Sequence, residues 1–213
     1  MIEPLNTQTS YDAVAAEYAA RFFHELAHKP FDRKMLDWLI EKVAGSGAIC
    51  DLGCGPGQIA RYLRDHGAEA CGIDLSPEMV AQAQQLNPDL SFYQGDMLAL
   101  TAVPDDYYGG VAAFYSLIHV PAGLVVDALK EIKRVLRSEG VLLLTFHIGS
   151  QVVHLDDWWE QKVNLDFNFF ETQAIKGHLA EAGFTPEEVI ERDPYPEIEV
   201  QTRRAYIFAR KRA

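Results

Sequence analysis

The sequence predicts an α/β domain with a doubly wound, mostly parallel sheet, and three observations support this fold class. After Gly47, short apolar runs alternate with helical stretches, which is typical of βαβ units. Val141–Phe146 is nearly all apolar, as expected for a central strand covered on both faces. The last two expected strands, at about Phe184–Glu191 and Ala205–Arg210, follow one another without a helix, which favours an antiparallel pair.

The helices and strands are placed in order along the chain. Residues 1–44 are expected to form a helical cover, with an apolar stripe over Asp12–Ala27 that Ser10 caps and a second helix at Asp32–Val43. Strands are expected at Ala48–Leu52, Glu69–Asp74, Leu90–Gln94, Gly110–Tyr115, Val141–Phe146, Phe184–Glu191 and Ala205–Arg210. The intervening helices are expected at Gln58–His66, after the cap Ser76 with Pro77 at the first position, across Leu124–Leu136, and at Glu171–Ala182.

Residues 147–170 interrupt this alternation with an aromatic and acidic segment that is densest at His154–Glu160. Long insertions in compact domains are often functional lids. We therefore expect an irregular cap at this point, lying over the binding edge of the sheet.

Composition places the chain among ordinary globular proteins and limits its partners. It has 213 residues, 48% hydrophobic and 23% charged, which predicts one domain over residues 1–213. Lys plus Arg number 19 against 31 for Asp plus Glu, and the net charge of −12 disfavours nucleic acid and anionic membranes as partners. Met1–Ser10 has no basic start followed by an apolar stretch, and no run of about 18 apolar residues occurs, so we expect a soluble cytoplasmic protein. The three cysteines favour reduced thiols, and no metal site is expected.

A glycine loop follows the first strand of the sheet. In Asp51–Gly57 three glycines alternate, which lets the backbone bend sharply and approach a ligand closely. A plain tight turn explains the same glycines. Asp74 ends the second strand about 20 residues later, where a carboxylate can accept both hydroxyl protons of a ribose. This pair of features indicates a nucleoside site, for a nicotinamide dinucleotide or for S-adenosylmethionine.

Two further observations distinguish these nucleosides. Dinucleotide folds use Gly-x-Gly-x-x-Gly, whereas Gly53, Gly55 and Gly57 alternate as Gly-x-Gly-x-Gly. Asp96 and Met97 end the third strand, where the acid can accept the adenine amine and the thioether can pack on the ring. A loop-capping role explains Asp96 alone. Together the strand ends favour a sulfonium nucleoside over a pyrophosphate.

With these motifs the chain resembles the class I S-adenosylmethionine-dependent methyltransferase family. Asp51–Gly57 resembles the family's first motif, Gly72–Ser76 its ribose motif, Gln94–Met97 its adenine motif, and Leu136–Leu143 the segment that leads into the fifth strand. The resemblance implies a Rossmann-like, seven-stranded sheet whose last strand is antiparallel. It also implies methyl transfer from S-adenosyl-L-methionine to an O, N or S nucleophile of a small molecule, with S-adenosyl-L-homocysteine as product.

The resemblance also assigns residues to the cofactor. Gly53 and Gly55 are expected at its methionine part, Asp74 and Leu75 at the ribose, and Asp96 and Met97 at the adenine. The remaining predicted cofactor contacts are Tyr11, Tyr18, Asp51, Met79, Phe114 and Tyr115. Core packing explains the spacing of Tyr11 and Tyr18 equally well, and Asp106–Val111 departs from the family by lacking its acid, aromatic, acid order.

The acceptor side of the site is predicted less directly. His119, after the fourth strand, is the first candidate for a general base, and His147, at the end of the fifth, is the second; a structural hydrogen bond is the alternative for both. Candidate acceptor contacts are His154, Trp158, Trp159 and Arg203; packing of the cap on the sheet is the alternative for the two tryptophans. Arg203 and Arg204 stand just before the last strand, where at least one can reach an acceptor carboxylate, and a solvated surface position is the alternative for both.

Two other functions remain possible at this point. A nicotinamide-dependent oxidoreductase would use the glycine loop and Asp74 in a similar way. A non-catalytic module would bind the cofactor without turnover, because a fold alone does not establish an activity. The sequence leaves the acceptor and the oligomeric state open.

Overall fold

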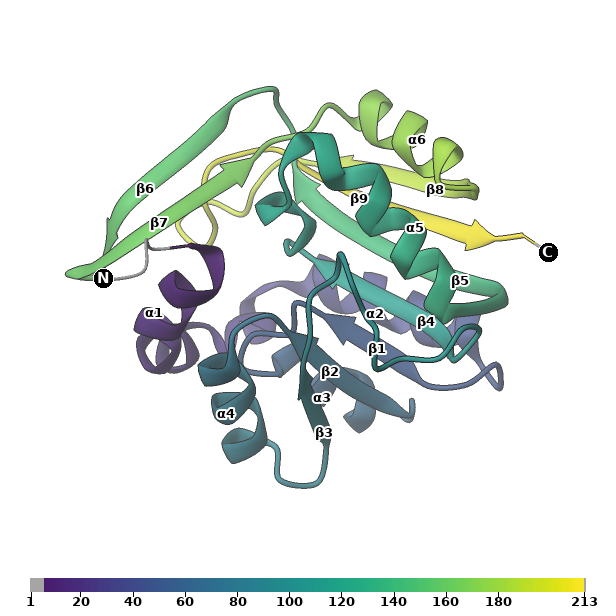
Figure 1. The fold of residues 1–213 in the computed structure, drawn as a ribbon, viewed down its shortest axis with the longest axis horizontal. Coiled ribbons are helices and arrows are strands. Elements are labelled where there is room, and N and C mark those ends of the chain that lie inside the picture. Colours follow the sequence, from purple (N-terminus) through teal and green to yellow (C-terminus); the bar gives the residue numbers. More distant parts are fainter. Residues whose placement is uncertain (1–5, 213) are drawn as a thin grey trace.

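The central sheet has seven strands in the order β3-β2-β1-β4-β5-β9-β8 (Figure 1). The structure is a computed structural model that describes residues 6–212. The ends of the expected domain and of the expected helical cover, at Met1–Leu5 and Ala213, lie outside the described residues. The strands are β1 (Ile49–Leu52), β2 (Ala70–Asp74), β3 (Ser91–Gln94), β4 (Tyr108–Phe114), β5 (Leu136–His147), β8 (Phe184–Arg192) and β9 (Arg204–Lys211). Neighbours from β3 to β5 are parallel, and β9 is antiparallel to both β5 and β8. The predicted fold, with its last strand antiparallel, is confirmed.

Helices cover both faces of the sheet. They are α1 (Thr7–Phe22), α2 (Pro30–Val43), α3 (Gln58–Asp65), α4 (Pro77–Leu86), α5 (Val125–Val135) and α6 (Thr172–Glu181), with short 3-10 turns at Glu25–His28, Leu117–His119 and Ala122–Leu124. α5 and α6 pack on one face, and α2 and α3 pack on the other (Figure 1). Of the two helices expected as a cover, α2 is therefore a sheet-packing helix, and α1 alone extends past the sheet edge.

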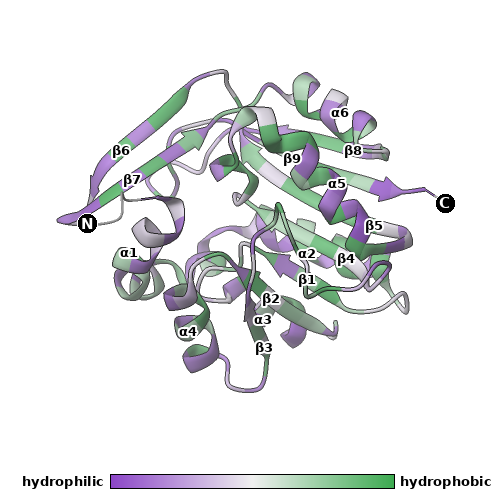
Figure 2. Cartoon of the chain, in the orientation of Figure 1, coloured by the Kyte–Doolittle hydropathy of each residue, from purple (hydrophilic) through white to green (hydrophobic). Residues whose placement is uncertain are grey.

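The core is divided by the alternation of side chains along β5. Leu142 and Leu144 face the α5 and α6 side, and Val141 and Leu143 face α2 and α3. All four are buried, so the strand is apolar on both faces as its sequence predicts. Figure 2 shows the same hydrophobic band running through the central strands.

The cap predicted over residues 147–170 is a regular hairpin, so the expectation of irregular structure was wrong. β6 (Val152–Trp158) and β7 (Gln161–Asn168) form a separate two-stranded antiparallel sheet. Val163 and Leu165 alternate with exposed neighbours and pack on Val14 of α1. The period of two is present in β7, but the acidic and aromatic residues of β6 obscure it in the sequence.

The first helix begins earlier than predicted. Asn6 is its cap: its side chain accepts a hydrogen bond from Thr9 N at 3.0 Å, and Thr9 Oγ1 accepts one from Asn6 N at 2.9 Å. Ser10, the expected cap, lies inside α1, where its hydroxyl accepts from Asn164 N of β7 at 2.8 Å. The other expected elements are present at similar bounds, except that β5 begins at Leu136, directly after α5. No helix in the described part of the chain is long and apolar enough to cross a membrane.

Truncating the central strand is expected to destabilise the whole domain. Leu144→Ala removes a fully buried side chain and should lower the free energy of unfolding by about 2–5 kcal/mol, because the close-packed core cannot refill the cavity. Urea denaturation measures this change. Leu86→Ala is the matched control, since Leu86 is 40% exposed, and it should cost less than about 1 kcal/mol. Equal losses for both variants would contradict this account of the core.

Candidate active site

A cavity of about 460 Å³ lies at the carboxyl ends of the parallel strands, beneath α1 and the β6–β7 hairpin. Open α/β sheets bind their ligands at this edge, and the volume suits a small molecule. The predicted site residues that line the cavity are Tyr11, Tyr18, Asp51, Gly53, Gly55, Asp74, Leu75, Met79, Asp96, Met97, Phe114, Tyr115, His119, His147 and Trp158. The fold thus gathers side chains from five strand ends and from the N-terminal helix into one space.

The glycine loop after β1 is held by its neighbours on both sides. Gly53 has a φ of 76° and lies so close to the loop after β4 that a Cβ atom there would stand 2.3 Å from Ser116 Cβ. Asp51, buried beneath the loop, accepts a hydrogen bond from Ala60 N in the first turn of α3 at 3.1 Å. This bond ties the loop to the helix that follows it.

Asp74 is the central acid of the cavity. Its two carboxylate oxygens accept hydrogen bonds from Gly55 N at 2.7 Å and Ser76 N at 2.9 Å. Burial raises the pKa of Asp74 and the two backbone donors oppose that rise. Each oxygen keeps a second lone pair, so the carboxylate can still accept two hydroxyl protons.

Asp96 has the loop-capping contact that its sequence alone suggested, and it also lines the cavity. Its Oδ1 accepts from Leu98 N at 2.8 Å, which leaves Oδ2 without a hydrogen bond from residues 6–212. Met97 lies beside it in the wall. The cavity wall therefore offers an acceptor oxygen and a thioether where the sequence predicts adenine.

The first candidate base, His119, has both ring nitrogens occupied. Its Nδ1 lies 3.0 Å from the Asp166 carbonyl, which can only accept, so Nδ1 carries the proton. Nε2 therefore accepts from the Tyr11 hydroxyl at 2.7 Å. Burial lowers the pKa of His119 to about 4. In this arrangement His119 links α1 to β7 through two hydrogen bonds. The ring therefore fits the structural role considered for it, and not the role of a free general base.

His147 is the better placed of the two histidines to accept a proton. Its Nδ1 lies 2.7 Å from Thr202 Oγ1, and no hydrogen bond from the described residues reaches Nε2. When Nδ1 donates to Thr202, Nε2 carries the lone pair. Burial, together with the charges of Arg204 and Lys29, lowers the pKa of His147 to about 4, so the ring is neutral at pH 7.

Aromatic side chains of α1 and the hairpin close the cavity. Trp158 makes edge contacts with Tyr11 and Tyr18, with ring centroids 6.0 and 5.8 Å apart. Burial raises the pKa of both tyrosines, so their hydroxyls remain protonated; Tyr11 donates to His119, and the Tyr18 hydroxyl can donate to a ligand. Tyr11 and Tyr18 therefore both pack against the hairpin and line the cavity, so the two roles considered for them occur together.

Three predicted acceptor contacts lie outside the cavity wall. His154 is exposed on β6 and binds Asp166 and Asp156. Trp159 stacks on the outer side of Trp158, with Arg21 above its ring. Arg203 is exposed and pairs with Glu191 at 3.0 Å. Neighbours in the sequence thus differ in position: Trp158 and Arg204 line the cavity, and Trp159 and Arg203 do not.

Comparisons with known proteins indicate a family. Residues 50–144 match a family model described as a methyltransferase domain. The putative methyltransferase YqeM of Bacillus subtilis is 31% identical over 142 residues, covering 65% of this chain and 57% of that protein. The malonyl-[acyl-carrier protein] O-methyltransferase of Enterobacter lignolyticus is 30% identical over 152 residues, covering 69% and 58%. These matches support the class I S-adenosylmethionine-dependent methyltransferase family, which the sequence motifs resemble.

The fold itself is similar to that of solved structures. A solved methyltransferase structure from Methanosarcina mazei aligns with a TM-score of 0.72 over 82% of this chain and 97% of that one, at 17% identity. The chain spans less than two thirds of the length of the two curated relatives. What those longer proteins methylate is therefore not carried over to this chain.

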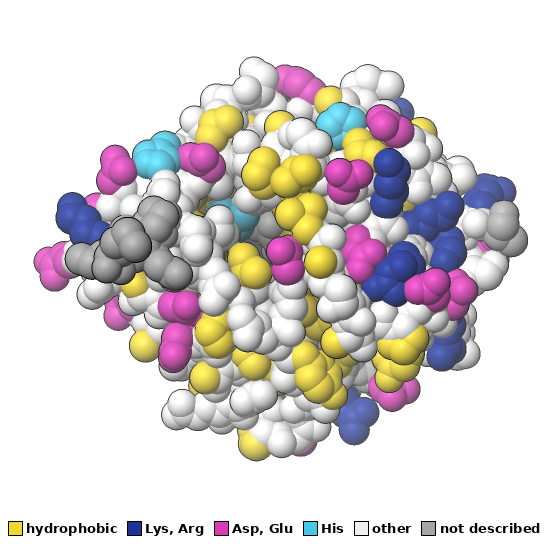
Figure 3. All heavy atoms as spheres, viewed as in Figure 1, with side chains coloured by type: hydrophobic (Ala, Val, Ile, Leu, Met, Phe, Trp, Pro, Cys, Tyr) yellow, Lys and Arg dark blue, Asp and Glu magenta, His cyan; other side chains and the backbone are white. Residues whose placement is uncertain are grey.

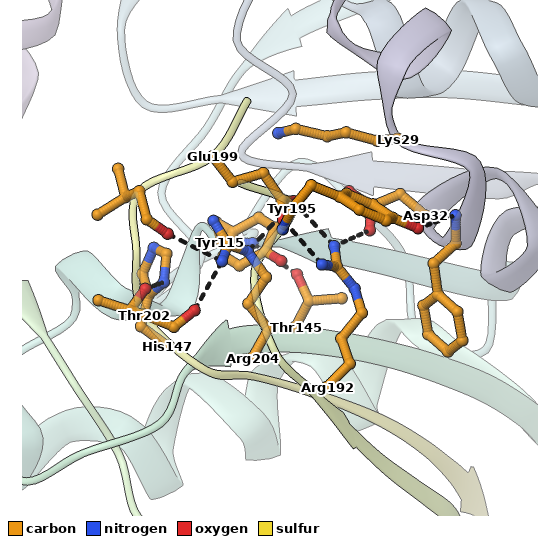
Figure 4. Close-up of polar contacts among 12 residues, drawn as sticks. Lys29, Asp32, Tyr115, Thr145, His147, Arg192, Tyr195, Glu199, Thr202 and Arg204 are labelled. Atoms are coloured by element: carbon orange, nitrogen blue, oxygen red, sulfur yellow. Dashed lines mark hydrogen bonds and ion pairs between the residues drawn. The ribbon is translucent and has the colours of Figure 1, made fainter. Parts of the chain in front are cut away.

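Apart from Arg204, which the sequence offers beside Arg203, the polar groups at the far end of the cavity were not predicted (Figure 4). Lys29, Asp32, Glu199 and Arg204 line it there, and Arg192 lies behind them. Burial raises the pKa of Asp32, whereas the Tyr206 hydroxyl and Arg192 oppose that rise. In the sequence, the arginine pair before the last strand was the one indication of this group. Of that pair, Arg204 is the buried residue.

The described residues contain no group of three or more His, Cys, Asp or Glu side chains arranged to hold a metal ion. On the face seen in Figure 3, Lys and Arg gather mainly toward the C-terminal end of the chain, and Asp and Glu are spread more widely.

The three histidines around the site are expected to titrate at different pH values. In an NMR titration, His119 and His147 should show midpoints near pH 4, because burial disfavours their charged forms. Exposed His154 should titrate above 6.5, because Asp166 and Asp156 stabilise its proton.

This difference has a defined effect on stability. Between about pH 6.5 and 4 the unfolded chain binds protons that the two buried rings do not, so their contribution to stability falls as the pH falls. His119→Asn should therefore reduce the loss of stability between pH 7 and 5, measured by urea denaturation beside His154→Asn as control. A His119 midpoint near 6.5 would contradict the buried, neutral ring.

Proposed function

We propose that the protein transfers the methyl group of S-adenosyl-L-methionine to an O, N or S atom of a small molecule, releasing S-adenosyl-L-homocysteine. The observation that supports this most is the single cavity in which Asp74, Asp96 and the glycine loop line one part and His147 lines another. The first part suits an adenosine, and the second leaves room for an acceptor. The family match supports the same cofactor.

Each end of the cofactor has a proposed partner in the chain. Asp74 would accept the ribose hydroxyls with the lone pairs that Gly55 and Ser76 leave free. Asp96 would accept the adenine amine, with Met97 against the ring. Gly53 and Gly55 would let the backbone approach the methionine part, under the hydroxyls of Tyr11 and Tyr18.

The bound cofactor supplies an electrophilic methyl group on a sulfonium, so the protein's task is to align the acceptor and exclude water. The Tyr11, Tyr18 and Trp158 cluster covers the cavity and performs the second part of this task. His147 Nε2 would take the acceptor's proton, since the ring is neutral at pH 7. His119 would act through Tyr11 as a positioning residue.

A small acceptor agrees with the shape and charge of the protein. The net charge of −12 opposes the approach of a polyanion such as RNA or DNA. The β6–β7 hairpin and α1 lie over the cavity and pack on each other through Val14, Val163 and Leu165. Of the two other functions considered, the oxidoreductase is opposed by the alternating glycines and by the family match. The non-catalytic module is tested by turnover.

Removing the central acid should weaken cofactor binding. Asp74→Asn keeps the shape of the side chain but loses charge-assisted acceptance of the ribose hydroxyls, so affinity for S-adenosyl-L-homocysteine should fall by about 1–3 kcal/mol. Isothermal titration calorimetry measures the change. Asp127→Asn, an exposed acid on α5, is the control and should bind as the wild type does. Unchanged binding by a folded Asp74→Asn would place the ribose elsewhere.

Removing the proposed base should affect turnover and spare cofactor binding. A panel of small hydroxyl, amine and thiol acceptors is screened by release of S-adenosyl-L-homocysteine. For any hydroxyl or phenol turned over, His147→Gln should lower kcat about 100-fold or more, in the range of general-base effects, with cofactor affinity unchanged. Tyr11→Phe should mainly raise KM, since it loosens the cover. Cofactor binding without turnover of any acceptor would favour the non-catalytic module.

A further inference from the structure

We infer that the methyl acceptor carries a carboxylate and that Arg204 binds it. The inference rests on the proposed function, because it names the substrate class for the acceptor part of the same cavity. It depends on three observations, which are the unfilled donors of a buried guanidinium, the partners already taken by its neighbours, and its place beside His147.

Arg204 is a buried residue, 3% exposed, in the cavity wall. Its Nη1 donates to the carbonyls of Val200 at 3.0 Å and Thr202 at 2.7 Å. Its Nε lies 3.3 Å from a Glu199 oxygen but makes no hydrogen bond there, and no residue among 6–212 accepts from Nη2. Figure 4 shows Arg204 between Thr202 and Glu199, close to His147.

Such an arginine is unusual unless a ligand completes it. Buried polar groups are nearly always hydrogen-bonded, and a buried cation needs an anion as well. The planar guanidinium matches a carboxylate or a phosphate, because its nitrogens donate in a fixed fork. The open side of Arg204 is thus a preformed place for one of these anions.

Glu199 forms an ion pair with Arg204 at 3.3 Å but accepts no hydrogen bond from it, because Arg192 already donates to both Glu199 oxygens. Arg192 donates to both Glu199 oxygens, at 2.7 and 2.8 Å, and Tyr195 N donates at 2.8 Å to the oxygen that Arg192 Nη1 contacts. Lys29, a second cation of the wall, is paired with Glu25 at 2.5 Å. Arg204 is therefore the cation of this group that makes no hydrogen bond to a carboxylate among the described residues.

The position of Arg204 separates it from the cofactor part of the cavity. Arg204 begins β9 and is the register partner of His147 at the end of β5. The Asp74 and Asp96 strand ends lie on the other side of β1 and β4 in the sheet. A carboxylate on Arg204 would therefore hold the acceptor next to the proposed base and leave the adenosine part of the cavity free.

Charge and exposure at this end define the acceptor further. Asp32 and Glu199 share the wall, so one negative charge is accommodated better than the two of a phosphate monoester. Ile198 and Val200 line the cavity and are 51% and 68% exposed, which places apolar surface at its mouth. The chain thus suits a carboxylic acid with an apolar body, such as an aromatic acid.

The test compares matched ligands that differ in charge. Calorimetry measures the binding of benzoate, benzamide and phenyl phosphate to protein saturated with S-adenosyl-L-homocysteine. Benzoate should bind wild type about tenfold or more tightly than benzamide, and more tightly than phenyl phosphate. Arg204→Gln should reduce the acid preference to less than about threefold. Arg203→Gln, the same change at the exposed neighbour, should keep it.

Two variants at the exposed residue Val200 test the inference if Arg204→Gln does not fold. Val200→Glu places a competing carboxylate at the mouth and should lower benzoate affinity at least fivefold, whereas Val200→Gln, which is equal in size, should not.

Several outcomes would overturn the inference. These are equal binding of benzoate and benzamide, tighter binding of phenyl phosphate, an acid preference that survives in Arg204→Gln, or equal benzoate binding by the two Val200 variants. Loss of S-adenosyl-L-homocysteine binding in Arg204→Gln would assign the arginine to the cofactor's own carboxylate. Failure of S-adenosyl-L-homocysteine to bind wild type would remove the proposed function as well, whereas its binding without an acid preference removes this inference alone.

Discussion

The reversal of strand order between β1 and β4 is the constraint on which the whole cavity depends. β1 pairs with β2 on one side and with β4 on the other, so the chain leaves the two central strands in opposite directions and a crevice opens between them. The walls of that crevice are brought together at one point, where Gly53 leaves no room for a Cβ beside Ser116 and the Ser116 hydroxyl donates to the Leu52 carbonyl at 2.7 Å. Any side chain at Gly53 would push apart the two loops that define the site.

The crevice becomes a cavity because one turn of α1 contacts three other elements. Ser10 accepts from the backbone of β7, Tyr11 donates to His119, and Asp12 accepts from the Ser76 hydroxyl at the start of α4. These residues are consecutive, and on a helix they project in three directions. The cover is therefore fixed by polar contacts near the start of α1 and by the aromatic contact of Tyr18 with Trp158 about two turns later.

The sequence predicts those parts of the site in which residues of one short motif determine both the type of side chain and its position. Asp74 follows its strand and contacts Gly55 through backbone groups that the motif itself contains, so residue order alone indicates its place. Arg204 is different, because Arg203 and Arg204 have the same chemistry and only the pairing of β9 with β5 decides which one faces inward. Trp158 and Trp159 differ for a similar reason, since the chain turns between the hairpin strands at Trp159, which has a φ of 51°. Lys29 and Glu199 lie far from every motif, and only the tertiary fold brings them to the cavity.

The pairing of His147 with Arg204 links acceptor binding to base strength. Burial is the largest reason for the low pKa of His147, and the positive charge of Arg204 is the next. With the cavity empty, that charge keeps the ring unprotonated and ready to accept. A carboxylate seated on Arg204 would offset the charge, so the pKa of His147 would rise once the acceptor is in place. The same contact that orients the acceptor would then increase the affinity of Nε2 for the proton it must receive, and a neutral analogue of the acceptor would lose both effects at once.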